Sequence, residues 1–251
     1  MIICKLMGGL GNQLFQWAAS QSAKVKHNTE CYYEIDYFTQ KHGWKFELLE
    51  FNIEEPKVLE QNLFALPVVG DNFRHKELPD NCFLHGYWQS EKYFEEIKEN
   101  IKKQLEMSEE KKYDILNLYP FMKDETISLH VRRGDYLKAS HVHPCQTLGY
   151  YDKAVDLTRK SDTNILIFSD DIEWCKENFK YPNIHFSQNQ TNITDLYAMS
   201  LCSHNIIANS SFSWWGAWLN NNPSKRVVAP SNWFADGTHS GDIVPEGWTA
   251  I

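Results

Sequence analysis

The sequence predicts an α/β fold whose ligand lies beyond the carboxyl ends of parallel strands. Three observations lead to this prediction. Short apolar strands alternate with helices from residue 126 to residue 229, polar residues follow several of these strands, and a strand, a glycine turn and a helix occupy residues 2–25. A helix between two strands carries the chain back to the start of the sheet, which favours parallel pairing.

Each element is predicted from its hydrophobic period. In the N-terminal half we expect strands at residues 2–6, 30–35 and 83–88 and helices at residues 14–25, 91–104 and from 107 towards 123. Residues 56–79 carry no clear pattern. In the C-terminal half we expect strands at residues 126–131, 164–168, 184–186, 205–208 and 226–229, and helices at residues 148–159, 172–179, 195–202 and 212–219. Five strands separated by helices predict a parallel, doubly wound sheet.

Length and charge restrict the class of protein. The chain has 251 residues, which allows two domains, and we expect them at residues 1–125 and 126–251, because a polar stretch rich in Glu and Lys precedes the strand at 126. A net charge of −8 without a basic cluster argues against a nucleic-acid partner. No signal peptide and no run of ~20 apolar residues is evident, so we expect no membrane span and a cytoplasmic location. Six cysteines scattered singly predict reduced thiols rather than a zinc site.

The glycine turn MGGLGNQ joins the first strand to the first helix. It fits neither a dinucleotide fingerprint nor a P-loop, because Leu14 stands where the fingerprint needs its last small residue. Gly9 and Gly11 would let a ligand approach backbone amides at the helix N-terminus, with Asn12 as a side-chain donor. The alternative is a plain turn with an asparagine cap.

The loop after the strand at residues 126–131 is the strongest candidate for an anion site. Two adjacent arginines, Arg132 and Arg133, precede Gly134 and Asp135. A guanidinium holds a phosphate through two parallel hydrogen bonds and keeps its charge near neutrality. Adjacent residues at a strand end point to opposite sides, so only one arginine can face the ligand squarely. The alternative is a buried structural Arg–Asp pair.

Polar residues also follow two later strands. Ser210 and Ser211 open a helix after the strand NIIA, a geometry that suits phosphate oxygens, although both could instead be plain N-caps. Asp170 and Asp171 follow another strand, where consecutive carboxylates diverge and do not converge on one cation, so no metal site is predicted. The helical spacing of Trp214, Trp215 and Trp218 favours core packing over stacking on a sugar.

Taken together, these motifs resemble the α1,2-fucosyltransferase family, including its bacterial members. The residues that carry the resemblance are GGLGNQLFQWA at 8–18, GYWQSEKYF at 86–94, HVRRGDY at 130–136, FSDD at 168–171 and DLYAMSLCSHNIIANSSFSWWGAW at 195–218. They span nearly the whole chain in one order. The resemblance implies a GT-B-like fold of two Rossmann-like domains, with an acceptor-side N-terminal domain and the donor site at the strand carboxyl ends of the C-terminal domain. It also implies a relationship to the core α1,6- and protein O-fucosyltransferases.

The activity implied by the resemblance is a galactoside α1,2-fucosyltransferase. This enzyme moves L-fucose from GDP-L-fucose to the 2-hydroxyl of a galactose-terminated acceptor with inversion at the anomeric carbon, and it uses no metal and no other cofactor. Two alternatives stay open: a transferase for another GDP-deoxyhexose, and a non-catalytic sugar-binding protein that uses exposed aromatic residues. The underlying acceptor glycan and the oligomeric state are not readable from the sequence.

The resemblance also assigns roles to individual residues. Arg132 would hold the diphosphate, His130 the nucleoside, and Ser210 or Ser211 a phosphate oxygen. Asp195 would read guanine, its alternative being a first-turn acid that favours the helix dipole.

Residues of two further loops complete the assignment. Asn12 would contact donor or acceptor near the reacting centre, next to Gly9 and Gly11. Asp171, with its neighbour, matches an acidic pair that supports the donor loops.

The general base is open. Core fucosyltransferases carry a glutamate some ten residues past the motif histidine, where this sequence has Ser140. His141 and His143 follow in the same loop and have a suitable unperturbed pKa, and we take His143 as the catalytic candidate. A leaving phosphate oxygen could also accept the proton.

Overall fold

The computed structural model describes residues 1–40, 43–59, 66–188 and 191–251. The chain divides into two compact units. Unit 1 is Met1–Glu106 with Thr238–Pro245, and unit 2 is Met107–Gly237 with Glu246–Ile251. The expected boundary at residues 125 and 126 falls inside unit 2, because α3 (Glu109–Leu118) packs against a helix of that unit, α6 (Asn192–Leu201).

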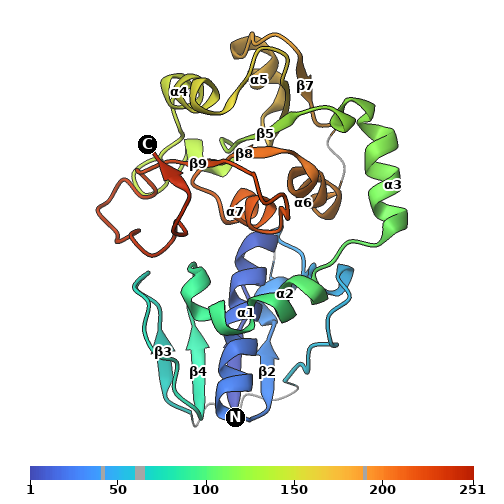
Figure 1. Cartoon of the computed structure of the whole chain (residues 1–251). Coiled ribbons are helices and arrows are strands. Elements are labelled where there is room, and N and C mark those ends of the chain that lie inside the picture. The colour runs from blue at the N-terminus through green and yellow to red at the C-terminus, as the bar shows by residue number, and fades with distance from the viewer. Residues whose placement is uncertain (41–42, 60–65, 189–190) are drawn as a thin grey trace. The chain divides into compact units, whose positions relative to one another are not determined.

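Unit 1 is built on a parallel sheet (Figure 1) with strand order β2-β1-β4-β3. Its strands are β1 (Ile2–Lys5), β2 (Cys31–Glu34), β3 (Val68–Gly70) and β4 (Cys82–His85). The long helix α1 (Leu10–His27) packs on this sheet through buried side chains that include Leu14, Phe15 and Ala18. It begins earlier than predicted, because the end of the glycine turn already has helical backbone.

Two expectations for unit 1 were wrong in detail. The predicted strand at 83–88 ends at His85, and the predicted helix at 91–104 is two 3-10 turns followed by α2 (Lys98–Gln104). The reason lies at Trp88, whose backbone has a left-handed φ of 55° and therefore breaks the strand. Ser90 then caps the first 3-10 turn by accepting a hydrogen bond from the Lys92 amide.

A segment from the C-terminal half completes unit 1. Within Thr238–Pro245, Asp242 accepts a 3.0 Å hydrogen bond from the His75 amide and forms an ion pair with Lys92. These two interactions lower the pKa of Asp242 to about 2. The carboxylate is therefore charged at neutral pH and ties the late segment to the loops of unit 1.

Unit 2 contains a parallel sheet with the order β10-β9-β8-β5-β6-β7. Its strands are β5 (Thr126–Val131), β6 (Asn164–Ser169), β7 (Ile184–Phe186), β8 (His204–Ile206), β9 (Val227–Ala229) and β10 (Thr249–Ala250). Its other helices are α4 (Leu148–Thr158), α5 (Ile172–Asn178) and α7 (Ser211–Trp218). The predicted parallel sheet is confirmed, except that the two-residue strand β10 is too short for a sequence pattern to predict.

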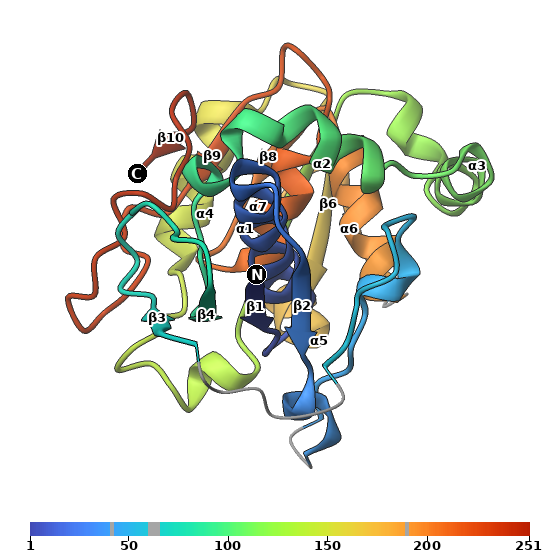
Figure 2. The ribbon, with the colours of Figure 1, turned by 90° about the horizontal axis from the view of Figure 1, so that it is seen from below.

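The two faces of this sheet differ in chemistry. Ile127, Leu129 and Val131 lie in an apolar cluster with residues of α4 and α5. On the other face, Asn205 donates to the Ser128 hydroxyl at 2.7 Å and accepts from Asn220 at 2.8 Å. Figure 1 shows α4 and α5 on one side of the unit 2 sheet and α6 and α7 on the other, and Figure 2 shows the same helices from below.

The three tryptophans of α7 are buried, and their rings contact one another at centroid distances of 5.1–6.1 Å. Their predicted role in core packing is therefore confirmed.

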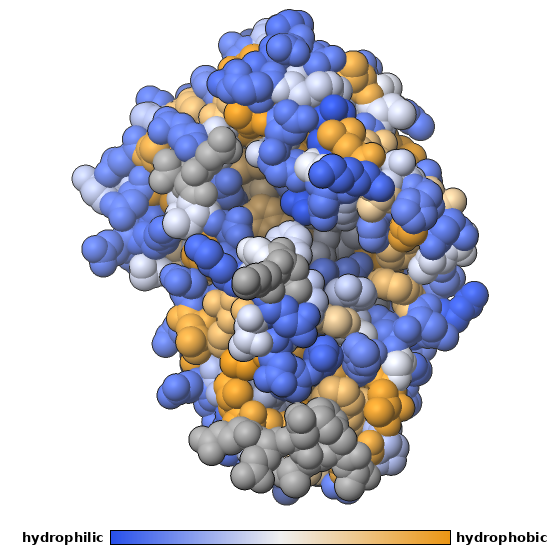
Figure 3. All heavy atoms as spheres, turned by 180° about the vertical axis from the view of Figure 1, so that it is seen from behind, coloured by the Kyte–Doolittle hydropathy of each residue, from blue (hydrophilic) through white to orange (hydrophobic). Residues whose placement is uncertain are grey.

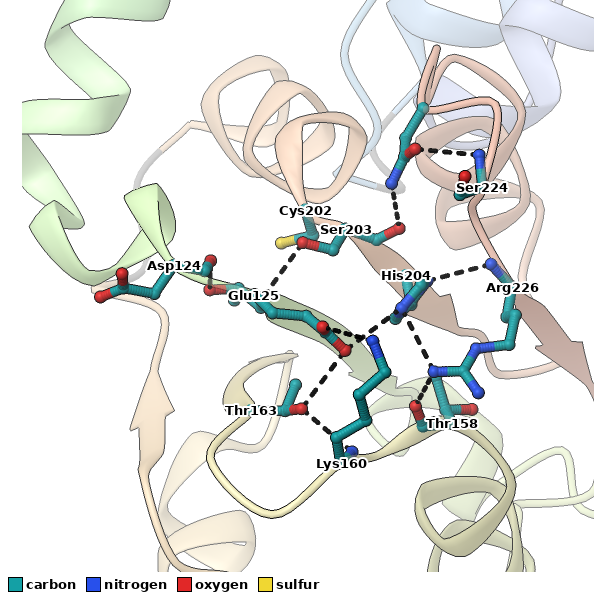
Figure 4. Close-up of polar contacts among 12 residues, drawn as sticks. Asp124, Glu125, Thr158, Lys160, Thr163, Cys202, Ser203, His204, Ser224 and Arg226 are labelled. Atoms are coloured by element: carbon teal, nitrogen blue, oxygen red, sulfur yellow. Dashed lines mark hydrogen bonds and ion pairs between the residues drawn. The ribbon is translucent and has the colours of Figure 1, made fainter.

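The amino end of the unit 2 sheet carries a polar network (Figure 4). Lys160 pairs with Glu125 at 2.8 Å, and Arg226 donates through its guanidinium to the Thr158 carbonyl at the end of α4. The backbone N–H of Arg226 donates to Nδ1 of His204 at 3.1 Å. Burial lowers the pKa of His204, so its ring is neutral at neutral pH. This network stabilises the end of the sheet away from the strand carboxyl ends.

The surface drawn in Figure 3 is mostly hydrophilic, with hydrophobic residues in small separate areas. Among the described residues, no helix combines the length and the apolar character that a membrane crossing requires.

Candidate active site

The loops after β5 and β6 meet through Arg132. Its Nη1 lies 3.1 Å from Oδ2 of Asp170, and its Nη2 lies 2.7 Å from Oδ1 of Asp135. The second oxygen of Asp170 accepts a 2.9 Å hydrogen bond from the Arg133 amide. A Cβ atom on Gly134 would lie 2.5 Å from Oδ2 of Asp170, so only glycine allows this close approach. Asp170 therefore fixes both the backbone and the guanidinium of the arginine loop.

Arg133 is held on a different partner set. Its Nε pairs with Oδ2 of Asp171 at 3.0 Å, and its guanidinium carbon lies 3.8 Å from the ring centroid of Trp174. Asp171 also caps α5 by accepting from the Trp174 amide. Arg133 and Asp171 thus form a structural pair, and the predicted contact of Asp171 with the donor stays a prediction.

His130 lies near the carboxyl end of β5, on the sheet face that α6 and α7 cover. Its side chain is buried, and its ring centroid is 5.8 Å from that of Phe212 in α7. Burial lowers the pKa of His130 to about 3, so the imidazole is neutral at physiological pH. Nδ1 is buried and has no hydrogen-bond partner in the described part of the chain. An unpaired buried nitrogen is costly, which marks His130 as a position that a ligand could satisfy.

His143 belongs to the same loop as the arginines. Its ring stacks on Tyr136 at a centroid distance of 4.9 Å, and the Arg132 guanidinium carbon lies 5.4 Å from the Tyr136 ring centroid. Tyr136 donates to the Asn209 carbonyl at 2.9 Å, which joins this loop to the loop after β8. Burial lowers the pKa of His143, so its ring is neutral and able to accept a proton at pH 7.

Ser210 is the N-cap residue of α7, but its hydroxyl makes no capping hydrogen bond. The position of Ser210 therefore agrees with the N-cap alternative, but its hydroxyl does not cap the helix. The preceding Asn209 is buried, donates to the Trp233 carbonyl and accepts from Gln146 at 3.0 Å. The Asn209 contacts fix the loop, and Ser210 with Ser211 forms an uncapped helix start of the kind that binds anions.

Asp195 lies in the first turn of α6, and its Oδ1 accepts a 2.8 Å hydrogen bond from Ser187. Burial raises the pKa of Asp195 to about 6, while the Ser187 hydrogen bond lowers it. A helix-dipole acid on the surface would have a depressed pKa, so the buried setting of Asp195 does not fit that alternative well. No hydrogen bond or ion pair between described residues joins Asp195 to the arginine loop.

The glycine turn belongs to unit 1. Gly9 is the N-cap of α1, so Asn12 does not have the capping position of the alternative interpretation. Instead, Oδ1 of Asn12 accepts a 2.8 Å hydrogen bond from Gln89. The neighbouring side chain of Gln13 bonds the Gly8 and Lys45 carbonyls.

The glycines of this turn allow close packing. A Cβ on Gly9 would lie 2.8 Å from the Trp44 ring, and Gly11 is buried in the first turn of the helix. Whether these glycines approach a ligand stays a prediction.

Several residues that hold the candidate side chains were not predicted from the sequence. They are Asp170 as the partner of Arg132, Tyr136, Gln146, Ser187 and Gln89. Their position in the sequence was the signal that could have identified them, because each of these residues lies in or beside a loop that follows a strand. A group of three or more His, Cys, Asp or Glu side chains suited to a metal ion is absent from the described residues.

Two relatives align with all or nearly all of the chain, and a third aligns with part of it. The alpha-1,2-colitosyltransferase of Escherichia coli is 30% identical over 100% of this chain and 99% of its own length. The Escherichia coli O-antigen biosynthesis glycosyltransferase WbnK is 31% identical over 97% of this chain and 98% of its own length. A galactoside alpha-(1,2)-fucosyltransferase of Rattus norvegicus is 25% identical over 63% of this chain and 47% of its own length.

Solved structures of glycosyltransferases share the fold. The NodZ alpha-1,6-fucosyltransferase soaked with GDP-fucose superposes with a TM-score of 0.56 at 16% identity, over 87% of this chain and 91% of that chain. A glycosyl transferase family 9 protein from Veillonella parvula gives a TM-score of 0.52 at 13% identity, over 100% of this chain and 85% of that chain.

The model of Glycosyl transferase family 11 matches residues 45–251. With the two full-length Escherichia coli relatives, this match confirms the resemblance that the motifs indicated: the chain belongs to glycosyl transferase family 11.

Proposed function

We propose that this chain transfers L-fucose from GDP-L-fucose to the 2-hydroxyl of a terminal β-galactoside, with inversion at the anomeric carbon. The observation that carries the proposal is the arginine loop, in which Asp170 fixes Arg132 at the carboxyl end of β5 in a chain of family 11. In this proposal unit 2 is a Rossmann-like donor-binding domain and unit 1 is the acceptor-side domain of a GT-B fold.

Binding of the donor would use three sets of residues in unit 2. Asp195 accepts from the N1 and N2 donors of guanine, and the buried Nδ1 of His130 bonds the nucleoside. The hydroxyls and amides at Ser210 and Ser211 hold a phosphate oxygen. Arg132 holds the diphosphate.

Both terminal nitrogens of Arg132 face carboxylates. Asp135 is the partner that the diphosphate would displace. Its side chain is 56% exposed and, among the described residues, makes no bond to the loop backbone like that of Asp170. Asp170 would stay in place and keep the guanidinium oriented.

Transfer breaks the bond between the anomeric carbon and the diphosphate oxygen, and GDP leaves with the electron pair. Negative charge therefore develops on the oxygen that faces Arg132, and a fixed donor aimed at such charge supplies about 3 kcal/mol. The acceptor oxygen attacks from the opposite face. Its proton passes to His143, which is neutral at pH 7, or to the departing phosphate. No metal is required in this scheme, because Arg132 and the helix start at Ser211 neutralise the diphosphate.

A donor carrying another deoxyhexose is the second candidate. It is favoured by the alpha-1,2-colitosyltransferase relative, which is similar over the whole length of the chain. Colitose lacks one hydroxyl that fucose carries, and the residues that bind the nucleotide would serve both donors equally.

Purified protein should be incubated with labelled GDP-fucose, or with the same nucleotide carrying colitose, and a panel of β-galactosides. The linkage of the product should then be located. We expect an α1,2-linked deoxyhexose on galactose. GDP binding without transfer to any acceptor would favour the non-catalytic alternative. Transfer of colitose but not of fucose would show that the donor is the colitose nucleotide and not GDP-fucose.

A further inference from the structure

The segment GYWQ, at residues 86–89, follows β4 in unit 1 and is not among the residues proposed to bind the donor. β4 and β1 are neighbouring parallel strands, so the loops after them lie at the same edge of the sheet. Two side-chain hydrogen bonds join the start of α1 to the loop after β4: Nε2 of Gln16 donates to the Gly86 carbonyl at 3.1 Å, and Nε2 of Gln89 donates to Oδ1 of Asn12 at 2.8 Å. The side chains of Asn12 and Gln89 are half-buried.

The loop that carries Gln89 is held rigidly. One carboxylate oxygen of Asp71 accepts from the amides of Tyr87 and Trp88, at 3.1 and 2.8 Å. A Cβ on Gly86 would lie 2.1 Å from the Asp71 side chain, so this approach needs glycine. Trp88 is fully buried despite its left-handed φ of 55°. A large residue adopts this left-handed conformation only where the surrounding structure imposes it. The conformation of Trp88 in turn fixes the direction of the next residue, Gln89.

Asn12 is fixed from the other side. Gly8 has a φ of 77°, and a Cβ there would lie 2.7 Å from Nδ2 of Asn12. The amide of Asn12 therefore lies against a bare backbone. Its oxygen is used by Gln89, whereas its Nδ2 has no hydrogen-bond partner among the described residues. A side-chain amide has two donor hydrogens on nitrogen, and no described residue accepts either of them from Asn12.

We infer that Gln89 is a positioning residue that holds the Asn12 amide with its NH₂ group turned to the substrate. The inference rests on the proposed function and on the role that the family resemblance implies for Asn12, which is contact with donor or acceptor near the reacting centre. Gln89 itself touches no reacting atom. It sets which end of the Asn12 amide the substrate meets.

This arrangement predicts an unusual order of variant activities. Gln89→Met removes the donor and keeps the length, so the Asn12 amide loses its orientation. Gln89→Glu places a carboxylate beside Oδ1, so the amide turns over, donates Nδ2 to the new carboxylate and presents its oxygen to the substrate. Glu is nearly identical to Gln in shape. A role in packing alone would therefore make Gln89→Glu the milder change, whereas positioning makes it the more severe one.

The test is a double-mutant cycle on transfer from GDP-fucose to lactose, with kcat and KM measured for each variant. The cycle contains Asn12→Ala, Gln89→Glu and the combined variant, with Gln89→Met alongside. The matched control is Gln104→Glu, because Gln104 also donates to an asparagine oxygen at 2.9 Å, but on the exposed helix α2. Thermal melting is recorded for every variant.

We expect Gln89→Glu to lower kcat at least tenfold, which corresponds to an increase of about 1.4 kcal/mol in the activation free energy. Gln89→Met should lose less, and Gln104→Glu should match the wild type. In the Asn12→Ala background, Gln89→Glu should change kcat less than about twofold.

Full additivity of the two substitutions, wild-type activity of Gln89→Glu, or wild-type activity of Asn12→Ala overturns the inference while the proposed function stands. A wild-type protein that transfers no deoxyhexose to any galactoside overturns the proposed function, and the inference with it.

Discussion

Asp195 provides the most quantitative test of the donor site. Its pKa is about 6, and only the ionised carboxylate accepts hydrogen bonds from both N1 and N2 of guanine. The raised pKa means that the carboxyl takes up a proton as the pH falls through 6. At pH 7 most of the protein is ionised at this position, whereas at pH 5 about one molecule in eleven is. Affinity for GDP should therefore fall by up to about tenfold between pH 7 and pH 5.

Calorimetric titrations with GDP and with UDP between pH 5 and pH 8 measure this effect. The two nucleotides share the titration of their own terminal phosphate, so the ratio of their dissociation constants isolates the base. We expect the GDP preference to fall with a midpoint near pH 6, and to be small and independent of pH in Asp195→Asn.

Ser187→Ala should move the midpoint to higher pH, because the Ser187 hydrogen bond lowers the pKa of Asp195. His130 does not interfere, since its pKa is about 3. Parallel GDP and UDP curves in the wild type would refute the assignment of Asp195 to guanine.

Four further predictions concern the arginine loop, metal and acid stability. Arg132→Lys keeps the charge but loses the planar fork of the guanidinium, so the rate of transfer should fall at least about tenfold. Arg133→Lys should mainly lower the melting temperature. Equal kinetic losses in the two folded variants would contradict this difference. Gly134→Ala should weaken GDP binding because its Cβ would meet Asp170, and unchanged calorimetry would argue against that contact. Activity should persist in excess chelator; loss that manganese restores would overturn the metal-free scheme. Finally, burial lowers the pKa of His204 in the folded protein. The stability that the neutral ring contributes is complete above about pH 6.5 and is lost as the pH falls towards the folded pKa. In His204→Gln the free energy of unfolding, measured with urea, should therefore fall less steeply at acid pH.

Apart from β10, the strands of unit 2 were predictable because each is signalled locally. β5 coincides with the predicted residues 126–131, and its alternation of Ile127, Leu129 and Val131 corresponds to one buried face. Unit 1 was harder, because its loops depend on distant contacts. The positive φ of Trp88 ends the expected strand early, and nothing in the sequence near 88 shows that Asp71 holds that turn.

The candidate site was predictable in its residue types but not in its partners. Arg132 could be preferred to Arg133 only through the family motif, whereas the structure gives a physical distinction, since Trp174 covers the Arg133 guanidinium. Pairing of Arg132 with Asp170 joins loops after two different strands, which a single sequence does not specify. The same holds for Ser187 with Asp195, where the burial that raises the pKa arises from tertiary packing.

Unit 1 is not a contiguous stretch of sequence, because Thr238–Pro245 belongs to it and Asp242 bonds both His75 and Lys92. Chimeras between family members that aim to exchange unit 1 therefore need three junctions, near residues 106, 237 and 245, rather than one near the middle of the chain. A fusion at a single junction would combine the early loops of one parent with the Asp242 segment of the other. Library design by simple half-and-half recombination would then discard functional combinations for a reason unrelated to sugar recognition.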